Sequence, residues 1–190
     1  MKQKILVIDI ADPETESRGF FGELVYEDFL AEGNPDFEAV LPEDDWQAVS
    51  LNYTSGTTGI PKGVVYHTRG VYLLSTGNVL AWEMPHRPVY LWTLPMFHCN
   101  GWCFPWTVTL LAGTHVCLRK VTAKNIYESI AEHHVTHLCV APIVMNMIAS
   151  APEEEQRELP HRVEMMTAAA PPPPTVIASM EETGFNVTHV

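Results

Sequence analysis

The stretch "YTSGTTGIPKG", which runs from Tyr53 to Gly63, holds the residues of this sequence best suited to binding an anion. Its three glycines allow positive φ values and a close approach of the backbone to a ligand. Successive N–H groups in such a loop form a concave nest for anions, four aliphatic hydroxyls add donors, and the lysine adds a mobile charge suited to phosphate. The residues concerned are Thr54, Ser55, Gly56, Thr57, Thr58, Gly59 and Lys62. We predict a phosphate-binding loop, although a polar surface turn fits the composition equally well.

Two common nucleotide motifs do not fit this loop. A Walker A loop requires glycine, four residues and then Gly-Lys-Ser/Thr, and the residues after Gly56 do not supply that set at that spacing. The dinucleotide fingerprint Gly-x-Gly-x-x-Gly is absent as well.

The longer segment "YTSGTTGIPKGV" resembles the phosphate loop of the adenylate-forming enzymes, which include acyl-CoA synthetases, luciferases and peptide-synthetase adenylation domains. Further segments extend the resemblance over the whole chain. "DDWQAVSLNY" is similar to the family's lead-in strand, "LPMFHCNGWCFPW" to its next motif, and "TAAAPPPP" to the segment that lies against adenine. The resemblance implies that ATP and a carboxylic acid give acyl-AMP and pyrophosphate, and that coenzyme A then displaces AMP.

Carried over by position, the resemblance gives nucleotide-binding roles to two segments. Residues 54–59 and Lys62 would hold the β- and γ-phosphates, and Thr54 would reach a Mg²⁺ ion. Attack of a carboxylate on the α-phosphate requires that charge on the departing pyrophosphate be neutralised, which hydroxyl donors, a lysine and Mg²⁺ can do. The residues expected to flank adenine are Ala169, Ala170 and Pro171.

The same resemblance places an acyl pocket at "PMFHCNGWC", with His98, Gly101 and Trp102 as substrate-binding residues. His98 stands where amino-acid-activating relatives carry an aspartate, so an amine-bearing acid has no obvious counter-ion. Trp102, Phe104 and Trp106 would give an aromatic lining suited to an aliphatic or thioether chain. The sequence of this segment most resembles that of the short- and medium-chain acyl-CoA synthetases, including ligases for methylthio-propionate-type acids. Without the resemblance, Trp102 and Trp106 are better explained as core residues of one helix.

Other residues near these motifs have more ordinary explanations. His98, Cys99 and Cys103 lack a fourth ligand and match no zinc spacing. Three further histidines follow one another near the end of a predicted helix, where their charge would complement the helix dipole. This explains them better than a metal site does. These are His133, His134 and His137. The segment "VAPIVMNMI" (140–148), with two methionines, is a candidate for a second wall of the acyl pocket.

Composition limits the possible partners. The net charge of −12 over 190 residues disfavours a nucleic-acid surface. No stretch reaches the roughly 18 apolar residues that span a bilayer. The opening "MKQKILVIDI" is unlike a secretory signal, so we expect a cytoplasmic protein whose four cysteines are reduced.

The elements that must position these motifs alternate between strand and helix. Strands are expected at 4–10, 46–53, 88–94, 114–118, 135–141, 161–167 and 186–190. Helices are expected at 67–82, 104–112, 122–134, 142–150 and 172–183, with Thr68 and Thr122 as N-caps and one short helix within 20–30. This pattern predicts an α/β fold with a largely parallel sheet and flanking helices. The phosphate loop would follow one strand and precede a helix, whose amides would point at it.

We expect residues 1–190 to be an incomplete AMP-binding domain, with a lead-in strand and acidic linker at 1–45 and the sites in 46–190. The resemblance implies further parts: a Tyr-Gly-x-Thr-Glu motif whose glutamate helps to hold Mg²⁺, a ribose-binding Thr-Gly-Asp motif, and a small C-terminal domain with a catalytic lysine. The chain would then be an inactive piece of an acyl-CoA synthetase. The whole protein would act on a small carboxylic acid, and the sequence is compatible with an oligomer of that whole protein. The alternative is a non-catalytic nucleotide-binding or protein-interaction module.

Overall fold

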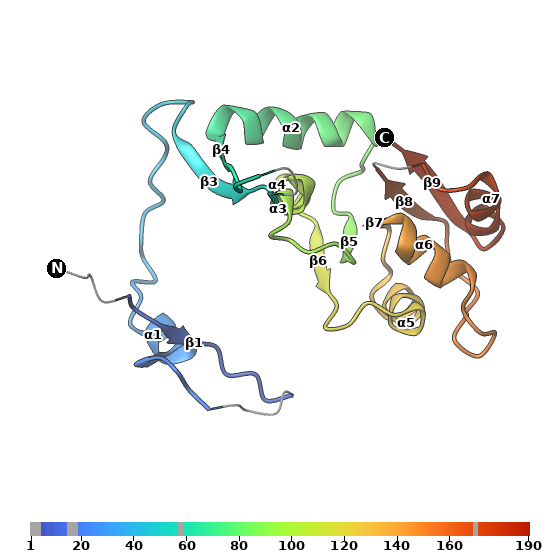
Figure 1. Cartoon of the computed structure of the whole chain (residues 1–190), viewed down its shortest axis with the longest axis horizontal. Helices are drawn as coiled ribbons and strands as arrows, with labels where there is room; N and C mark the ends of the chain where they lie inside the picture. Colours follow the sequence, from blue (N-terminus) through green and yellow to red (C-terminus); the bar gives the residue numbers. More distant parts are fainter. Residues whose placement is uncertain (1–4, 15–18, 57–58, 169–170) are drawn as a thin grey trace. The chain divides into compact units, whose positions relative to one another are not determined.

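The computed structural model describes residues 5–14, 19–56, 59–168 and 171–190. The chain divides into two compact units, residues 1–41 and residues 42–190 (Figure 1). In the first unit, β1 (Ile8–Asp9) pairs in parallel with β2 (Leu24–Val25), and α1 (Tyr26–Ala31) follows. The prediction of a strand buried on both faces at 4–10 is wrong, because only two residues pair and Ile5 and Ile10 are 83% and 75% exposed.

The second unit contains a five-stranded sheet in the order β6-β5-β7-β8-β9, in which every neighbouring pair is parallel. This confirms the predicted α/β class with a largely parallel sheet. The strands are β5 (Val89–Trp92), β6 (Thr114–Cys117), β7 (His137–Cys139), β8 (Val163–Thr167) and β9 (Phe185–His189). The helices of this unit are α2 (Thr68–Ala81), α3 (Cys99–Trp102), α4 (Phe104–Leu110), α5 (Ala123–His133), α6 (Pro142–Ala149) and α7 (Pro174–Glu182).

Two apolar clusters cover the two faces of this sheet. Alternate strand residues point to opposite faces, so Leu91 and Leu138 join the first cluster with residues of α5, α6 and α7. Tyr90 and Trp92 join the second cluster with residues of α4 and the end of α2. Figure 1 shows α2 and α4 on one side of the strands and α5, α6 and α7 on the other.

Helix ends show where the sequence signals succeed and where they do not. Thr122 caps α5 by accepting from the Asn125 N–H at 3.2 Å, as predicted. For α2 the cap is His67 rather than Thr68, because the His67 Nδ1 atom accepts from the Gly70 N–H at 2.9 Å. Within the described residues, no helix is both long and apolar enough to cross a bilayer.

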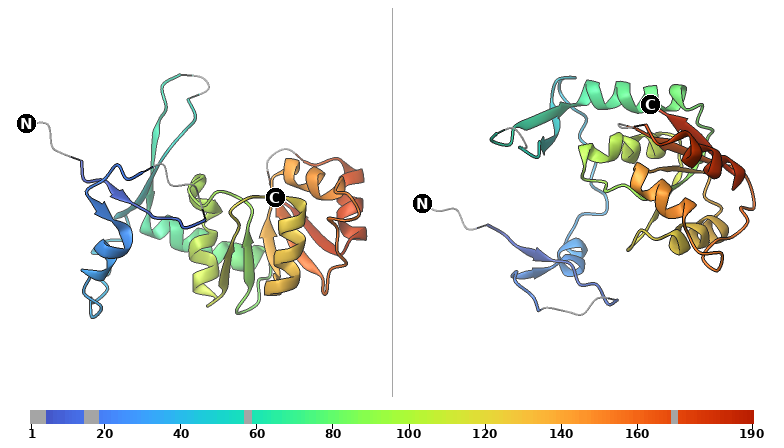
Figure 2. Two further views of the ribbon diagram at one scale, coloured as in Figure 1. Left: turned by 90° about the horizontal axis from the view of Figure 1, so that it is seen from below. Right: turned by 45° about the vertical axis from the view of Figure 1, so that its right-hand side comes forward.

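The phosphate-loop segment joins two antiparallel strands, β3 (Ala48–Tyr53) and β4 (Gly63–His67), in a hairpin that projects from the rest of the second unit (Figure 2). The expectation that a helix follows the loop directly is therefore wrong. Because β4 intervenes, the N-terminal amides of α2 lie at the far end of a strand from the loop. Anion binding by the loop must rely on the loop's own donors.

Candidate functional site

The neck of the phosphate loop is closed by two hydrogen bonds between Thr54 and Lys62. The Thr54 N–H donates to the Lys62 carbonyl at 3.0 Å, and the Lys62 N–H donates to Thr54 Oγ1 at 3.0 Å. Gly56 has φ +70°, and a Cβ atom there would lie 2.7 Å from the Gly59 carbonyl oxygen, so this position requires glycine. These contacts fix a tight loop with Ser55, Gly59 and Lys62 exposed.

Two predicted phosphate ligands, Thr57 and Thr58, lie outside the described residues, as do Ala169 and Ala170 of the adenine segment. The remaining adenine candidate, Pro171, is exposed and follows the carboxyl end of β8. Ligands of open parallel sheets bind beyond the carboxyl ends of the strands. The last residue of β8, Thr167, is fully buried at this edge, and its hydroxyl has no hydrogen-bond partner among the described residues. Sequence reasoning missed this hydroxyl.

After the carboxyl end of β5, the acyl motif forms a left-handed turn, defined here as residues 99–103, which includes the short segment α3 and does not have the backbone angles of a right-handed helix. Its φ values are +46°, +41°, +52°, +54° and +63°, from Cys99 to Cys103. Left-handed backbone costs an L-residue about 1–2 kcal/mol, and Gly and Asn tolerate it best. The turn therefore interrupts what would otherwise be one helix, so Trp102 and Trp106 are not successive positions of a single helical stripe.

The three predicted substrate residues come together at this turn. His98 precedes it and is exposed, and its carbonyl accepts from the Gly101 N–H at 2.9 Å. Gly101 is buried, and Trp102 is half-buried against the second cluster. The Trp102 carbonyl also accepts from Asn78 Nδ2 at 3.0 Å, which fixes the turn to α2.

The turn and the hairpin meet through a polar contact that sequence reasoning missed. Asn100 Oδ1 accepts from Ser50 Oγ at 2.6 Å and from Asn52 Nδ2 at 2.7 Å. Ser50 and Asn52 alternate along β3 and therefore share one face of the strand. The alternation of the two polar residues is visible in "AVSLNY", but the sequence does not indicate that both side chains contact Asn100.

Two secondary expectations are corrected. Met145 of "VAPIVMNMI" is fully buried in the first cluster, on the other face of the sheet from the cluster that contacts Trp102, so it is not a wall of the acyl turn. His137 does not join a cluster at the C-terminus of α5, because it is 3% exposed and its ring lies edge-on to Trp82 at 5.0 Å. Burial lowers the pKa of His137 to about 4. His133 and His134 are exposed at the end of α5, as expected.

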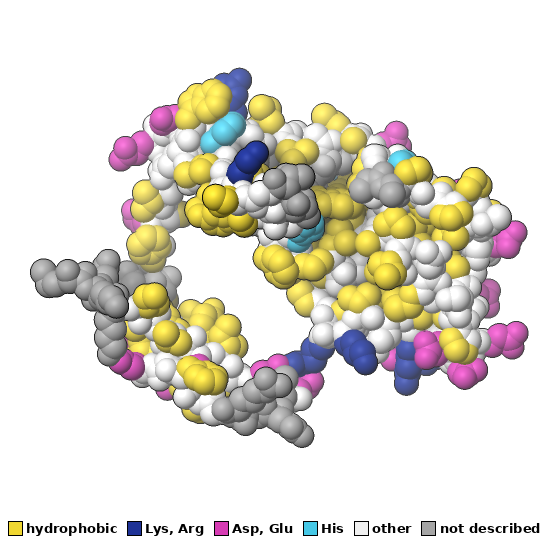
Figure 3. Space-filling view, viewed as in Figure 1, with side chains coloured by type: hydrophobic (Ala, Val, Ile, Leu, Met, Phe, Trp, Pro, Cys, Tyr) yellow, Lys and Arg dark blue, Asp and Glu magenta, His cyan; other side chains and the backbone are white. Residues whose placement is uncertain are grey.

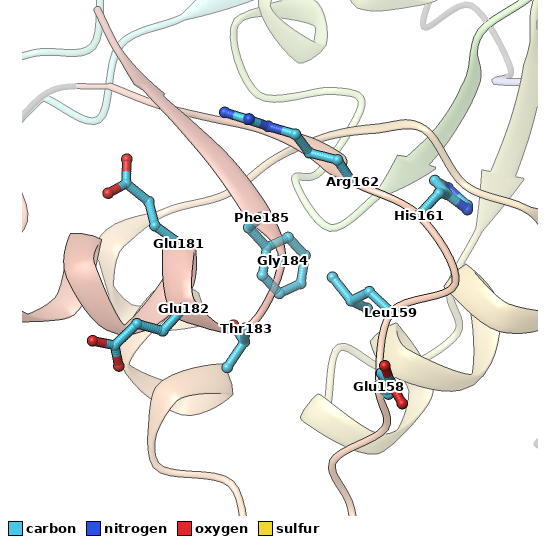
Figure 4. Close-up of a pocket in the computed structure, with 9 residues that line it drawn as sticks. All are labelled: Glu158, Leu159, His161, Arg162, Glu181, Glu182, Thr183, Gly184 and Phe185. Atoms are coloured by element: carbon cyan, nitrogen blue, oxygen red, sulfur yellow. The ribbon is translucent and has the colours of Figure 1, made fainter.

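A hollow of about 680 Å³ lies elsewhere in the second unit, between the segment that precedes β8 and the end of α7 (Figure 4). Its lining includes Arg162, Glu181 and Phe185. Because these residues adjoin the amino ends of β8 and β9, the hollow is at the opposite end of the strands from the predicted sites. No group of three His, Cys, Asp or Glu residues in the described part of the chain could hold a metal ion.

The sequence and the fold both match known proteins. Residues 2–190 match the family model for the AMP-binding enzyme. The peroxisomal acetate/butyrate–CoA ligase of Arabidopsis thaliana is 53% identical over 190 residues, which cover 97% of this chain and 33% of that protein. The acetate–CoA ligase of Humulus lupulus is 50% identical over 193 residues, covering 99% of this chain and 34% of that protein.

Two solved structures have the same fold as this chain. The inhibitor-bound N-terminal domain of FACL13 from Mycobacterium tuberculosis superposes with a TM-score of 0.78 at 26% identity, covering 86% of this chain and 41% of that one. O-succinylbenzoate coenzyme A synthetase from Bacillus subtilis, in complex with ATP and magnesium ion, has the same fold with a TM-score of 0.70 at 22% identity, covering 86% and 34%. The chain spans about a third of the length of the curated relatives it matches. Because the family model matches nearly all of it, this chain belongs to the AMP-binding enzyme family.

Proposed function

We propose that the whole protein to which this chain belongs acts as an acyl-CoA ligase, which activates a carboxylic acid with ATP to acyl-AMP and transfers the acyl group to coenzyme A. One observation carries this proposal: the phosphate hairpin and the acyl turn are joined through Asn100. A nucleotide held by the loop and an acid held at the turn would therefore be neighbours, which an attack of the carboxylate on the α-phosphate requires. The names of the relatives, acetate/butyrate–CoA and acetate–CoA ligase, support the same activity.

For the nucleotide, Thr54 to Gly59 and Lys62 are the proposed phosphate ligands. The Thr54 hydroxyl already accepts one hydrogen bond from the Lys62 N–H, which leaves it one lone pair and its proton. A Mg²⁺ ion keeps several waters and uses few protein ligands beside substrate phosphates. A single hydroxyl ligand at Thr54 is therefore compatible with Mg²⁺ bound chiefly by ATP, where the ion would neutralise charge on the pyrophosphate group.

For the acid, we propose a short, uncharged chain bound at His98, Gly101 and Trp102. Trp102 supplies aromatic surface. The exposed side chain at His98 supplies no carboxylate to pair with an amine. The acids in the names of the relatives, acetate and butyrate, are of this kind.

The cytoplasmic location and an oligomeric state stay predictions. The name of the Arabidopsis relative includes the word peroxisomal. In Figure 3, hydrophobic side chains extend over much of the visible surface of the second unit, and acidic side chains gather at its margin. Such an apolar surface favours contact with other protein surfaces over contact with nucleic acid.

The phosphate role is tested by Lys62→Ala. We expect the dissociation constant for MgATP, measured by isothermal titration calorimetry, to rise at least about tenfold, because one charged hydrogen bond to phosphate is lost. Lys120→Ala is the control, since Lys120 is also exposed but lies in the segment before α5. Equal affinities for MgATP in the Lys62 and Lys120 variants would place the phosphates elsewhere. Absence of MgATP binding by the unaltered whole protein would refute the proposed function itself.

A further inference from the structure

We infer that Asn100 is a positioning residue that couples the phosphate hairpin to the acyl turn. The inference has two parts. That Asn100 links the hairpin to the turn rests on geometry alone, whereas the effect of MgATP at the hairpin on the acid site rests on the proposed function. Asn100 lies in the acyl-pocket segment, but it is neither a predicted phosphate ligand nor one of the predicted substrate-binding residues.

The left-handed turn needs external support. Four of its five residues have a side chain, and each is held at a φ value that L-residues rarely adopt. Such backbone persists only where surrounding contacts determine it, and it concentrates at functional sites. Within residues 99–103, the Cys103 N–H donates to the Asn100 carbonyl at 3.0 Å, and the Cys103 carbonyl accepts from the Thr107 N–H at 3.0 Å, which ties the end of the turn to α4. These backbone bonds do not hold the Asn100 side chain.

Support comes from two sides. Asn78 of α2 holds the Trp102 carbonyl from the helix side. Ser50 and Asn52 of β3 hold the Asn100 carboxamide oxygen from the hairpin side, with both bonds ending on the same atom. All three polar residues of the hairpin contact are half-buried, where an acceptor that loses its partners is costly.

The coupling follows from the connection of β3 to the phosphate loop. Asn52 lies two residues before Thr54, whose N–H and hydroxyl close the neck of the phosphate loop. A ligand that fixes the loop fixes the end of β3 and with it the two donors to Asn100. The turn that carries Gly101 and Trp102 is then held in its left-handed form. Occupation of the phosphate loop would thereby prepare the acid site.

Matched substitutions separate the hydrogen bonds from the backbone. Asn100→Gly keeps a residue that accepts φ +41° but removes the acceptor atom. Asn100→Asp keeps both the tolerance for this backbone and the acceptor oxygen. Asn78→Ala loosens the same turn from α2 and leaves the hairpin contact intact. Asn52→Ala removes one donor without changing the turn.

The readout is the rate at which iodoacetamide modifies Cys103, followed by mass spectrometry. Cys103 is 1% exposed and ends the turn, so its alkylation reports opening of the turn. Cys139 in β7 is 0% exposed and reports global unfolding in the same sample. Without ligand, we expect Asn100→Gly to accelerate modification of Cys103 about tenfold, because two hydrogen bonds are lost, while Asn100→Asp stays within about twofold of the unaltered protein.

With saturating MgATP, we expect slower modification of Cys103 in the unaltered protein, in Asn100→Asp and in Asn78→Ala, and no such response in Asn100→Gly. An unchanged ligand-free rate in Asn100→Gly, or a retained MgATP response there, overturns the coupling. If Cys139 in Asn100→Gly is modified faster as well, that variant has unfolded, and Asn52→Ala takes its place. In Asn52→Ala, faster modification of Cys103 alone supports the coupling, and an unchanged rate at Cys103 overturns it. If MgATP changes nothing in the unaltered protein and does not bind it, the proposed function fails, and the ligand-free rates still decide whether Asn100 ties the hairpin to the turn.

Discussion

Replacing Gly101 with alanine is expected to destabilise the second unit by about 3 kcal/mol, from left-handed backbone strain and overpacking together. The new Cβ atom would lie 2.7 Å from Trp92 Cζ3 and 2.9 Å from Cη2, and φ at this residue is +52°. Trp92 cannot move aside easily, because it is 95% buried and its Nε1–H donates to His115 Nδ1 at 3.0 Å. Urea unfolding followed by tryptophan fluorescence measures the loss.

Gly77→Ala is the matched control for this experiment. Gly77 lies inside α2, and a Cβ atom there would meet no atom within 4 Å. Alanine is favoured over glycine in a helix interior by roughly 1 kcal/mol, so this variant should be as stable as the unaltered protein or more so. If the two variants lost the same stability, neither the contact with Trp92 nor the left-handed backbone would explain the requirement for glycine at residue 101.

The parallel sheet and its helices could be predicted because their signals are local and repeated. In α5, four residues at helical spacing, Ala123, Ile126, Tyr127 and Ile130, are all buried as the sequence pattern indicates. Thr122 supplied a clear start for the same helix. Short runs of β-branched and aromatic residues between such helices gave the strands, and the crossover rule gave their direction.

The elements that depend on distant contacts were missed. In β4 the residues Gly63, Val64 and Val65 are exposed, so no alternation of apolar and polar side chains marks it as a strand. It exists because it pairs with β3, from Tyr53↔Gly63 to Ala48↔His67. Its absence from the prediction also led to the mistaken placement of a helix N-terminus beside the phosphate loop.

The candidate site was predicted in its residue types but not in its geometry. A left-handed turn over 99–103 has no sequence signature, since only Asn100 and Gly101 favour positive φ. The contact between Asn100 and Ser50 joins residues fifty positions apart and can be found only in the folded chain. Resemblance identified the motifs, and tertiary contacts determine how they meet.

His137 gives the second unit a specific sensitivity to acid. It is 3% exposed, beside Trp82, and its cross-strand neighbours are Tyr90 on β5 and Glu164 on β8. The Glu164 carboxylate accepts from Asn186 Nδ2 at 2.6 Å, so it already has a hydrogen-bond donor. Burial lowers the pKa of the imidazole from 6.5 to about 4 in the folded chain. As the pH falls from 6.5 towards 4, the unfolded chain binds a proton at this site that the folded chain does not bind.

The stability that neutral His137 provides is therefore complete above pH 6.5 and is lost as the pH falls to about 4. Between pH 7.5 and pH 4.5 this single group should remove about 2.5 kcal/mol from the free energy of unfolding, given about 1.36 kcal/mol for each pKa unit. In His137→Gln, whose side chain does not titrate, the change in unfolding free energy over the same interval should be smaller by that amount. His134→Gln is the control, because it removes an exposed histidine of the same unit instead of the buried one. Urea unfolding of all three proteins at both pH values measures the difference. If His137→Gln and His134→Gln lose stability equally, the acid sensitivity has its origin in the carboxylates instead.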